Sequence, residues 1–150
     1  MRHLDWEERL NAVVAKHQAV PGEWGKSDCW TLTMDAIEAV HGKRVLSKLS
    51  RYRSEAAGYR IFAKAGFKTV EEALSSVLEP VPVLMAQRGD VGVIEREGVI
   101  SSGVFTSAGF AVRTIFGRTE KVDSKRVETI TGYDLQFLPI TAVKQAFQVR

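Results

Sequence analysis

The spacing of apolar residues divides the chain into a helical front and a strand-rich rear. Near the N-terminus, apolar residues recur at helical intervals, at Trp6, Leu10, Val13 and Val14. This spacing predicts an amphipathic helix that ends at about Ala19. Asp5 is expected to cap the helix, with Glu8 three residues later as its reciprocal partner.

A second helix is predicted from Cys29 to about Val40. It carries two apolar stripes, one made by Trp30, Thr33, Met34, Ile37 and Val40 and the other by Leu32, Ala36 and Ala39. Two stripes indicate that the helix is buried on both sides. Asp28 precedes it as a good N-cap, and Gly42 follows it as a C-terminal stop.

The polar and basic segment 43–53 predicts a loop. Two helices are expected after it, one over Ser54–Ala65 and one from a cap at Thr69 to a point before Pro80. The prolines at this point separate the helical front from the rear.

The rear is read as a series of short strands separated by turns. Strands are predicted over 83–85, 90–94, 99–106, 110–116, 127–133 and 146–149, with a turn at 95–98 and a charged loop at 118–126. The sequence therefore predicts an α+β fold in which helices from Asp5 to Leu78 precede an antiparallel sheet built after Pro82. Asp90, which follows Gly89, is interpreted as a turn residue that binds its own backbone.

The composition suits one domain over residues 1–150. The chain has 150 residues and 45% hydrophobic content, enough for a sizeable core. Its net charge of +3 comes with 21 basic residues that are scattered along the sequence, so no nucleic-acid partner is expected. No apolar run approaches the roughly 20 residues of a membrane span, and the N-terminus lacks a signal peptide's apolar segment. We therefore expect a soluble protein that is synthesised in the cytoplasm and has no membrane span.

Cys29 is the only cysteine and stands at the first position of the second predicted helix. The free N–H groups and positive end of a helix favour a thiolate there, although the neighbouring Asp28 carboxylate opposes it. A free cysteine is more often a small buried hydrophobe, and a nucleophilic one needs a histidine close in space. Trp24 and Trp30 are expected to pack around the Cys29 turn. One cysteine and three histidines show no metal-ligand spacing, so we expect no metal and no cofactor.

Three sequence boxes resemble those of a known family. They are Trp24-Gly25 followed by Asp28-Cys29, then Arg51-Tyr52-Arg53-Ser54 with Gly58, and then Ala86-Gln87-Arg88-Gly89-Asp90-Val91. Their order and spacing resemble the NlpC-type branch of the papain-like cysteine peptidases. They are more similar still to a phage and prophage group of that branch that is encoded among tail genes.

The resemblance implies a papain-like fold with Cys29 as nucleophile at the exposed N-terminal end of the central helix. It also implies a place in the virion, in the phage tail, with other tail-tip proteins and peptidoglycan as partners. Trp24, Asp28 and Ser102 are then candidate binding residues around Cys29.

The sequence departs from this family at the catalytic histidine. In the NlpC-type pattern the histidine opens a His-Val-Gly-Ile-Tyr-like strand, and the matching stretch here is Ser101-Ser102-Gly103-Val104-Phe105. No histidine follows His41. A serine hydroxyl has no accessible conjugate acid near neutral pH and cannot take over the role.

Three hypotheses follow. The favoured one is a structural or adaptor component of a phage tail tip, with a degenerate peptidase fold. The second is a cell-wall cysteine peptidase, a peptidoglycan hydrolase, that uses Cys29 as nucleophile and His17 as an unusual base. The third is an unrelated α+β binding module. His17 lies near the end of the first predicted helix and is more simply a solvated residue that complements the helix dipole. Without an imidazole beside it, Cys29 should become reactive only above about pH 8.

Overall fold

Four α-helices form in the first half of the chain in the computed structural model, which describes residues 1–150. They are α1 (Trp6–Ala19), α2 (Cys29–His41), α3 (Glu55–Lys64) and α4 (Val70–Ser75). Short 3-10 helices occur at η1 (Ser47–Ser50), η2 (Val83–Met85) and η3 (Ile140–Ala142). All four helices predicted from apolar spacing are therefore present.

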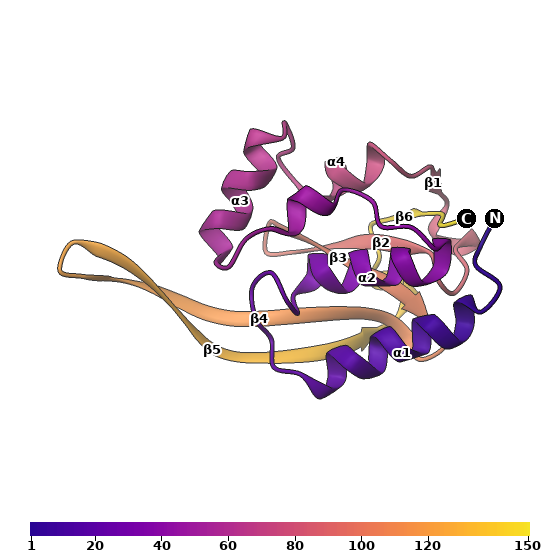
Figure 1. Cartoon of the computed structure of the whole chain (residues 1–150), viewed down its shortest axis with the longest axis horizontal. Helices are drawn as coiled ribbons and strands as arrows, with labels where there is room; N and C mark the ends of the chain where they lie inside the picture. The colour runs from indigo at the N-terminus through magenta and orange to yellow at the C-terminus, as the bar shows by residue number, and fades with distance from the viewer.

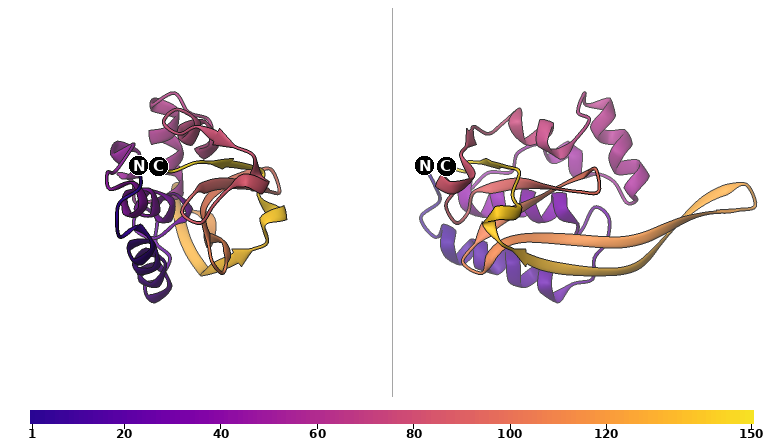
Figure 2. Two further views of the ribbon diagram at one scale, coloured as in Figure 1. Left: turned by 90° about the vertical axis from the view of Figure 1, so that its right-hand side faces the viewer. Right: turned by 180° about the vertical axis from the view of Figure 1, so that it is seen from behind.

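Six strands form one antiparallel sheet. They are β1 (Pro80–Val81), β2 (Val91–Arg96), β3 (Val99–Thr106), β4 (Gly109–Val122), β5 (Lys125–Leu138) and β6 (Gln145–Phe147). Their order across the sheet is β1-β6-β2-β3-β4-β5. The helices α1 and α2 lie along one side of the sheet (Figure 1), and the sheet curves away from them (Figure 2). The predicted α+β order, helices before an antiparallel sheet, is confirmed, although β1 begins slightly earlier than expected.

Three helix starts follow their local sequence. The side chains of Asp28, Ser54 and Thr69 each accept a hydrogen bond from the backbone N–H three residues later. Gly42 ends α2 in the left-handed conformation, with φ of 95°. Every residue of the two predicted stripes of α2 is buried, because this helix packs against both α1 and the sheet.

The predicted cap of the first helix is wrong. The Asp5 side chain accepts no capping hydrogen bond, and its backbone N–H instead donates to Nδ1 of His3 at 3.2 Å. The strand predicted over 83–85 is also wrong. Its residues form η2, because the Met85 N–H donates to the Pro82 carbonyl in a local turn and no neighbouring strand pairs with the segment.

The charged loop predicted over 118–126 is wrong as well. These residues lie in β4 and β5, which pair from Phe110 opposite Leu138 out to Val122 opposite Lys125. A two-residue turn at Asp123 and Ser124, both with positive φ, joins the strands. The outer part of this ribbon projects from the body of the molecule (Figure 1). Both of its faces meet solvent, so its residues are polar like those of a loop.

A buried carboxylate ties the two ends of the chain to the sheet. Asp90 is inaccessible to solvent, and its Oδ1 accepts hydrogen bonds from Arg2 at 2.9 Å, Arg150 at 2.8 Å and the Val149 N–H at 3.0 Å. Its Oδ2 accepts from the Gln87 N–H at 2.8 Å, which confirms the predicted turn contact. The two chain ends consequently lie side by side (Figure 1).

Replacing this carboxylate tests how much the contact between the chain ends contributes to stability. Asp90→Ala leaves the partly buried Arg2 and the buried Val149 N–H without this acceptor, and we expect it to lower the free energy of unfolding by about 3 kcal/mol. Urea denaturation measures the loss. Asp5→Ala is the matched control and should change stability by less than about 0.5 kcal/mol, because Asp5 makes no side-chain cap. Equal effects of the two variants would contradict the prediction.

Candidate functional site

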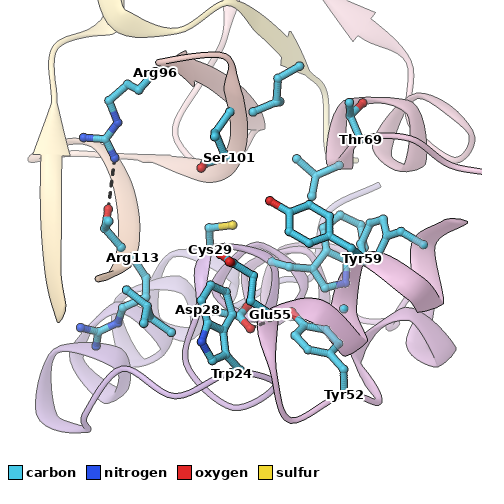
Figure 3. A pocket seen from close by; sticks show the side chains of 18 of the residues that line it. Trp24, Asp28, Cys29, Tyr52, Glu55, Tyr59, Thr69, Arg96, Ser101 and Arg113 are labelled. Atoms are coloured by element: carbon cyan, nitrogen blue, oxygen red, sulfur yellow. Dashed lines mark hydrogen bonds between the residues drawn. The ribbon is translucent and has the colours of Figure 1, made fainter. Parts of the chain in front are cut away.

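A cleft of about 920 Å³ opens at the N-terminal end of α2. Its walls come from α3, from the turn between β2 and β3, and from the middle of β4. Six aromatic side chains line it: Trp24, Trp30, Tyr52, Tyr59, Phe62 and Phe116. Cys29 lies between these walls (Figure 3). The structure therefore brings the predicted cysteine to a cleft.

The Asp28 carboxylate organises the floor of this cleft. It is 1% exposed, and its Oδ1 accepts from the Thr31 N–H at 2.8 Å. Its Oδ2 accepts from the Gly25 N–H at 2.8 Å and from the Tyr52 hydroxyl at 2.7 Å. The predicted binding residue Asp28 is thus saturated by the protein itself. It joins the turn before α2, the helix start and the loop that precedes α3.

The Cys29 thiol is held in its protonated form. Burial is the larger cause and the neighbouring Asp28 carboxylate the second, and together they raise its pKa to about 11. Hydrogen bonds from Ser102 and the Trp30 backbone favour the thiolate but do not offset these two effects. The helix end is therefore insufficient to activate this cysteine. The sequence predicted reactivity from about pH 8, near the unperturbed pKa of about 8.5, and that prediction is wrong because burial raises the pKa to about 11.

Two serines of β3 occupy the region where the resemblance implies a histidine. Ser102 is buried against the start of α2, where its hydroxyl donates to the Cys29 carbonyl at 3.1 Å and accepts from Thr33 Oγ1 at 2.8 Å. Ser101, which matches the histidine of the family pattern, lines the cleft instead (Figure 3). Neither hydroxyl can act as a base near neutral pH.

None of the three histidines lines the cleft. His41 lies at the far end of α2 and bonds the carbonyl of Arg150, while His3 accepts from the Asp5 backbone. An imidazole base for Cys29 is therefore absent from the cleft wall.

His17 is fully buried, so its interpretation as a solvated residue is wrong. Its Nδ1 lies 2.7 Å from Ser27 Oγ, and its Nε2 lies 2.8 Å from Asp35 Oδ2. Both ring nitrogens are thus engaged, because α1 packs this side of the helix against α2. To accept the Cys29 proton, His17 would first have to release one of these partners.

The polar network continues behind the cleft to a residue that sequence reasoning missed. Arg113 on β4 is 3% exposed, and it donates to Ser27 Oγ at 3.0 Å and to the Val20 carbonyl at 3.2 Å. Burial lowers the pKa of its guanidinium. The only sequence signal is an arginine within an apolar strand, since a buried arginine normally has polar partners. Arg113, Ser27 and His17 together connect the sheet to α1.

The two tryptophans near Cys29 differ in burial. Trp30 is 2% exposed and meets Phe62 edge to face, with ring centroids 4.9 Å apart. Trp24 lines the cleft and is only half-buried. The predicted packing around the Cys29 turn is therefore complete for Trp30, whereas Trp24 leaves part of its ring accessible to a ligand.

Charges that line the cleft balance one another. The cations are Lys68, Arg96 and Arg113, and the carboxylates are Asp28, Glu55 and Glu97. Nowhere do three His, Cys, Asp or Glu side chains gather as metal ligands. Aromatic contact is therefore the main interaction that this cleft offers to a ligand.

No helix has both the length and the apolar character that crossing a membrane requires.

A protein-family model described as a domain of unknown function (DUF6950) matches residues 1–149. The match covers all four α-helices and all six strands. No curated protein and no solved structure matches the chain.

The pH dependence of alkylation tests the state of the thiol. With a pKa of about 11, Cys29 should react with iodoacetamide at a rate that rises through pH 10 without a plateau. At pH 7 it should react about a hundredfold more slowly than an ordinary thiol. Mass spectrometry of the intact protein measures the rate, and Cys29→Ser provides the blank. A plateau near pH 7 that is lost in His17→Ala would establish an activated cysteine.

Removal of the Tyr52 hydroxyl tests the organising role of Asp28. Tyr52→Phe takes one hydrogen bond from a buried carboxylate, and we expect it to lower the free energy of unfolding by about 1.5–3 kcal/mol. Tyr59→Phe is the matched control, because Tyr59 is 59% exposed and makes no hydrogen bond through its hydroxyl. Thermal or urea unfolding measures both variants. A loss for Tyr52→Phe no larger than that for Tyr59→Phe would refute the role.

Proposed function

The chain belongs to the DUF6950 family, and we propose that it is a structural or adaptor component of a phage tail tip, built on a papain-like, NlpC-type fold without catalysis. One observation carries this proposal. The cleft holds a helix-terminal cysteine, but no imidazole lines it and the cysteine pKa is raised to about 11. A cysteine hydrolase needs a base to take the thiol proton and to protonate the leaving amine.

The arrangement of the site supports the papain-like part of the proposal. Cys29 begins a central helix that packs on an antiparallel sheet, and the neighbouring strand presents Ser101 and Ser102 beside it. The resemblance in the three sequence boxes implies this same order of elements. Function is nevertheless argued from the site, since one fold hosts many functions.

The cleft supports a binding role in the absence of a base. Its aromatic lining includes Tyr59 and Phe116, which are 59% and 49% exposed. Aromatic side chains that stay accessible in a concave site are suited to binding other molecules. The proposed partners are other tail-tip proteins and peptidoglycan, and the proposed location is the virion.

A peptidase remains the second candidate because the cleft reaches Cys29 itself. In that mechanism Cys29 Sγ attacks a peptide carbonyl while a base takes the thiol proton, and a rearrangement of α1 would have to supply that base from His17. The C–N bond then breaks as the base returns the proton to the leaving amine, and water hydrolyses the resulting thioester. The hydrogen bonds of the buried His17 to the buried Ser27 and the partly buried Asp35 oppose such a rearrangement.

Incubation with purified peptidoglycan separates the two functions. We expect the full chain to release no peptides between pH 5 and pH 9, because the thiol stays protonated and no imidazole is at hand. Mass spectrometry of the soluble fraction is the measurement, with Cys29→Ala as the matched control. Peptide release by the parent protein that is absent in Cys29→Ala would establish the peptidase and overturn the adaptor.

Purified phage particles test the proposed location. Quantitative mass spectrometry should find the chain in tails at a constant ratio to other tail proteins, with cross-links to one of them. Presence in the lysate but absence from purified particles would contradict the proposal.

A further inference from the structure

Two neighbouring strands of the sheet separate beside Cys29. β3 and β4 pair only at Val104 with Ala111, Phe105 with Phe110 and Thr106 with Gly109. Beyond these pairs, residues 99–103 remain bonded to β2 and residues 112–116 remain bonded to β5, but the two segments do not pair with each other. The strands visibly diverge in both Figure 1 and Figure 2. The sheet therefore contains an internal gap with an unpaired strand edge on each side.

This gap coincides with the cleft. Residues 99–101 line one wall and residues 113–116 line the other, with Cys29 between them (Figure 3). One side chain crosses from wall to wall, because Arg96 at the end of β2 donates to Thr114 Oγ1 at 3.1 Å and to Gln136 at 2.9 Å. The space between the edges is otherwise part of the cleft volume.

The two edges have the composition of strands that pair. Exposed edges are usually protected by proline, lysine or a bulge. Here the walls carry β-forming residues, namely Val99, Ile100, Thr114, Ile115 and Phe116. The only irregularity of β4 falls after this segment, between Phe116 and Gly117. The deeper ends of the two edges, at Ser102, Gly103, Val112 and Arg113, are buried. Unpaired backbone N–H and C=O groups at the outer ends, 99–101 and 114–116, are therefore the ones that an added strand can reach.

We propose that an extended polypeptide segment of a partner protein inserts as a strand between β3 and β4, above Cys29. This ligand class rests on the adaptor function proposed above. Because β3 and β4 are antiparallel, the inserted strand runs parallel to one of them and antiparallel to the other. Its alternate side chains meet the aromatic lining, and the balanced charges of the cleft fit a segment with apolar residues in those positions.

Backbone methylation of a model peptide tests the insertion. The probe is a blocked heptapeptide with lysine at both ends and alternating valine and threonine around a central phenylalanine. In an extended strand, successive N–H groups point to opposite sides. Two further peptides carry N-methyl groups, one at the even and one at the odd interior positions. If the strand lies between two edges, each set of methyl groups should weaken binding to the full chain at least tenfold, measured by fluorescence anisotropy.

Hydrogen exchange and matched variants locate the site. The unmodified peptide should slow amide exchange at least tenfold in both 99–103 and 112–116. Phe116→Ala, which truncates an exposed cleft side chain, should weaken binding at least fivefold. Ile130→Ala is the control, because Ile130 is also exposed but lies outside the cleft, and it should bind like the parent protein.

The outcomes separate this inference from the proposed function. Sensitivity to only one set of methyl groups, or to neither, overturns insertion between two strands, as does the absence of protection. If self-association without peptide slows amide exchange in both segments, the occupant is a second copy of the chain, and the proposed insertion of a partner segment is also overturned. If the peptide binds and is then cleaved, and Cys29→Ala abolishes the cleavage, the strand site is upheld and the adaptor function is overturned. No binding and no cleavage overturns the strand site alone.

Discussion

The buried Asp28 carboxylate is the contact on which the site depends. Three segments converge on it, through the N–H of Gly25, the first turn of α2 and the hydroxyl of Tyr52. A buried carboxylate is tolerated only when its hydrogen bonds are satisfied, so these segments are held together. Burial raises the pKa of Cys29, and the same charge raises it as well. The interaction that builds the floor of the cleft therefore also disfavours the thiolate.

The residues that carry the family resemblance are used by the fold itself. A Cβ at Gly25 would lie 1.8 Å from the Tyr52 carbonyl oxygen, and one at Gly58 would crowd the Tyr52 ring. Asp90, the acid of the third box, holds both chain ends. These requirements are structural, so the three sequence boxes are evidence about the fold and not about a reaction. Ser101, at the position where the proposed papain-like resemblance implies a histidine, supplies no base near neutral pH.

The divergence of β3 from β4 gives the molecule its accessible interior. Hydrogen bonds of Ser102 to Thr33 and to the Cys29 carbonyl join β3 to the first turn of α2. The hydrogen bond from Arg113 to Ser27 joins β4 to the segment that precedes α2. Each strand is thus bonded to a different part of the chain around Cys29. The gap between them is consequently a built feature, and the aromatic side chains of α3 form its outer rim.

Much of the fold was determined by short stretches of sequence. The caps at Ser54 and Thr69, the two stripes of α2 and the turn between β2 and β3 depend on residues a few positions apart, so local pattern predicted them. The charged residues of 118–126 led to the wrong prediction of a loop, because a two-stranded ribbon that is exposed to solvent on both faces needs no apolar side. Only the tertiary structure decided that His17 is buried, that Arg113 stands behind the cleft and that Asp90 joins the termini. Those contacts link residues that are distant in sequence, and their partners are set by how helices and sheet pack rather than by neighbouring residues.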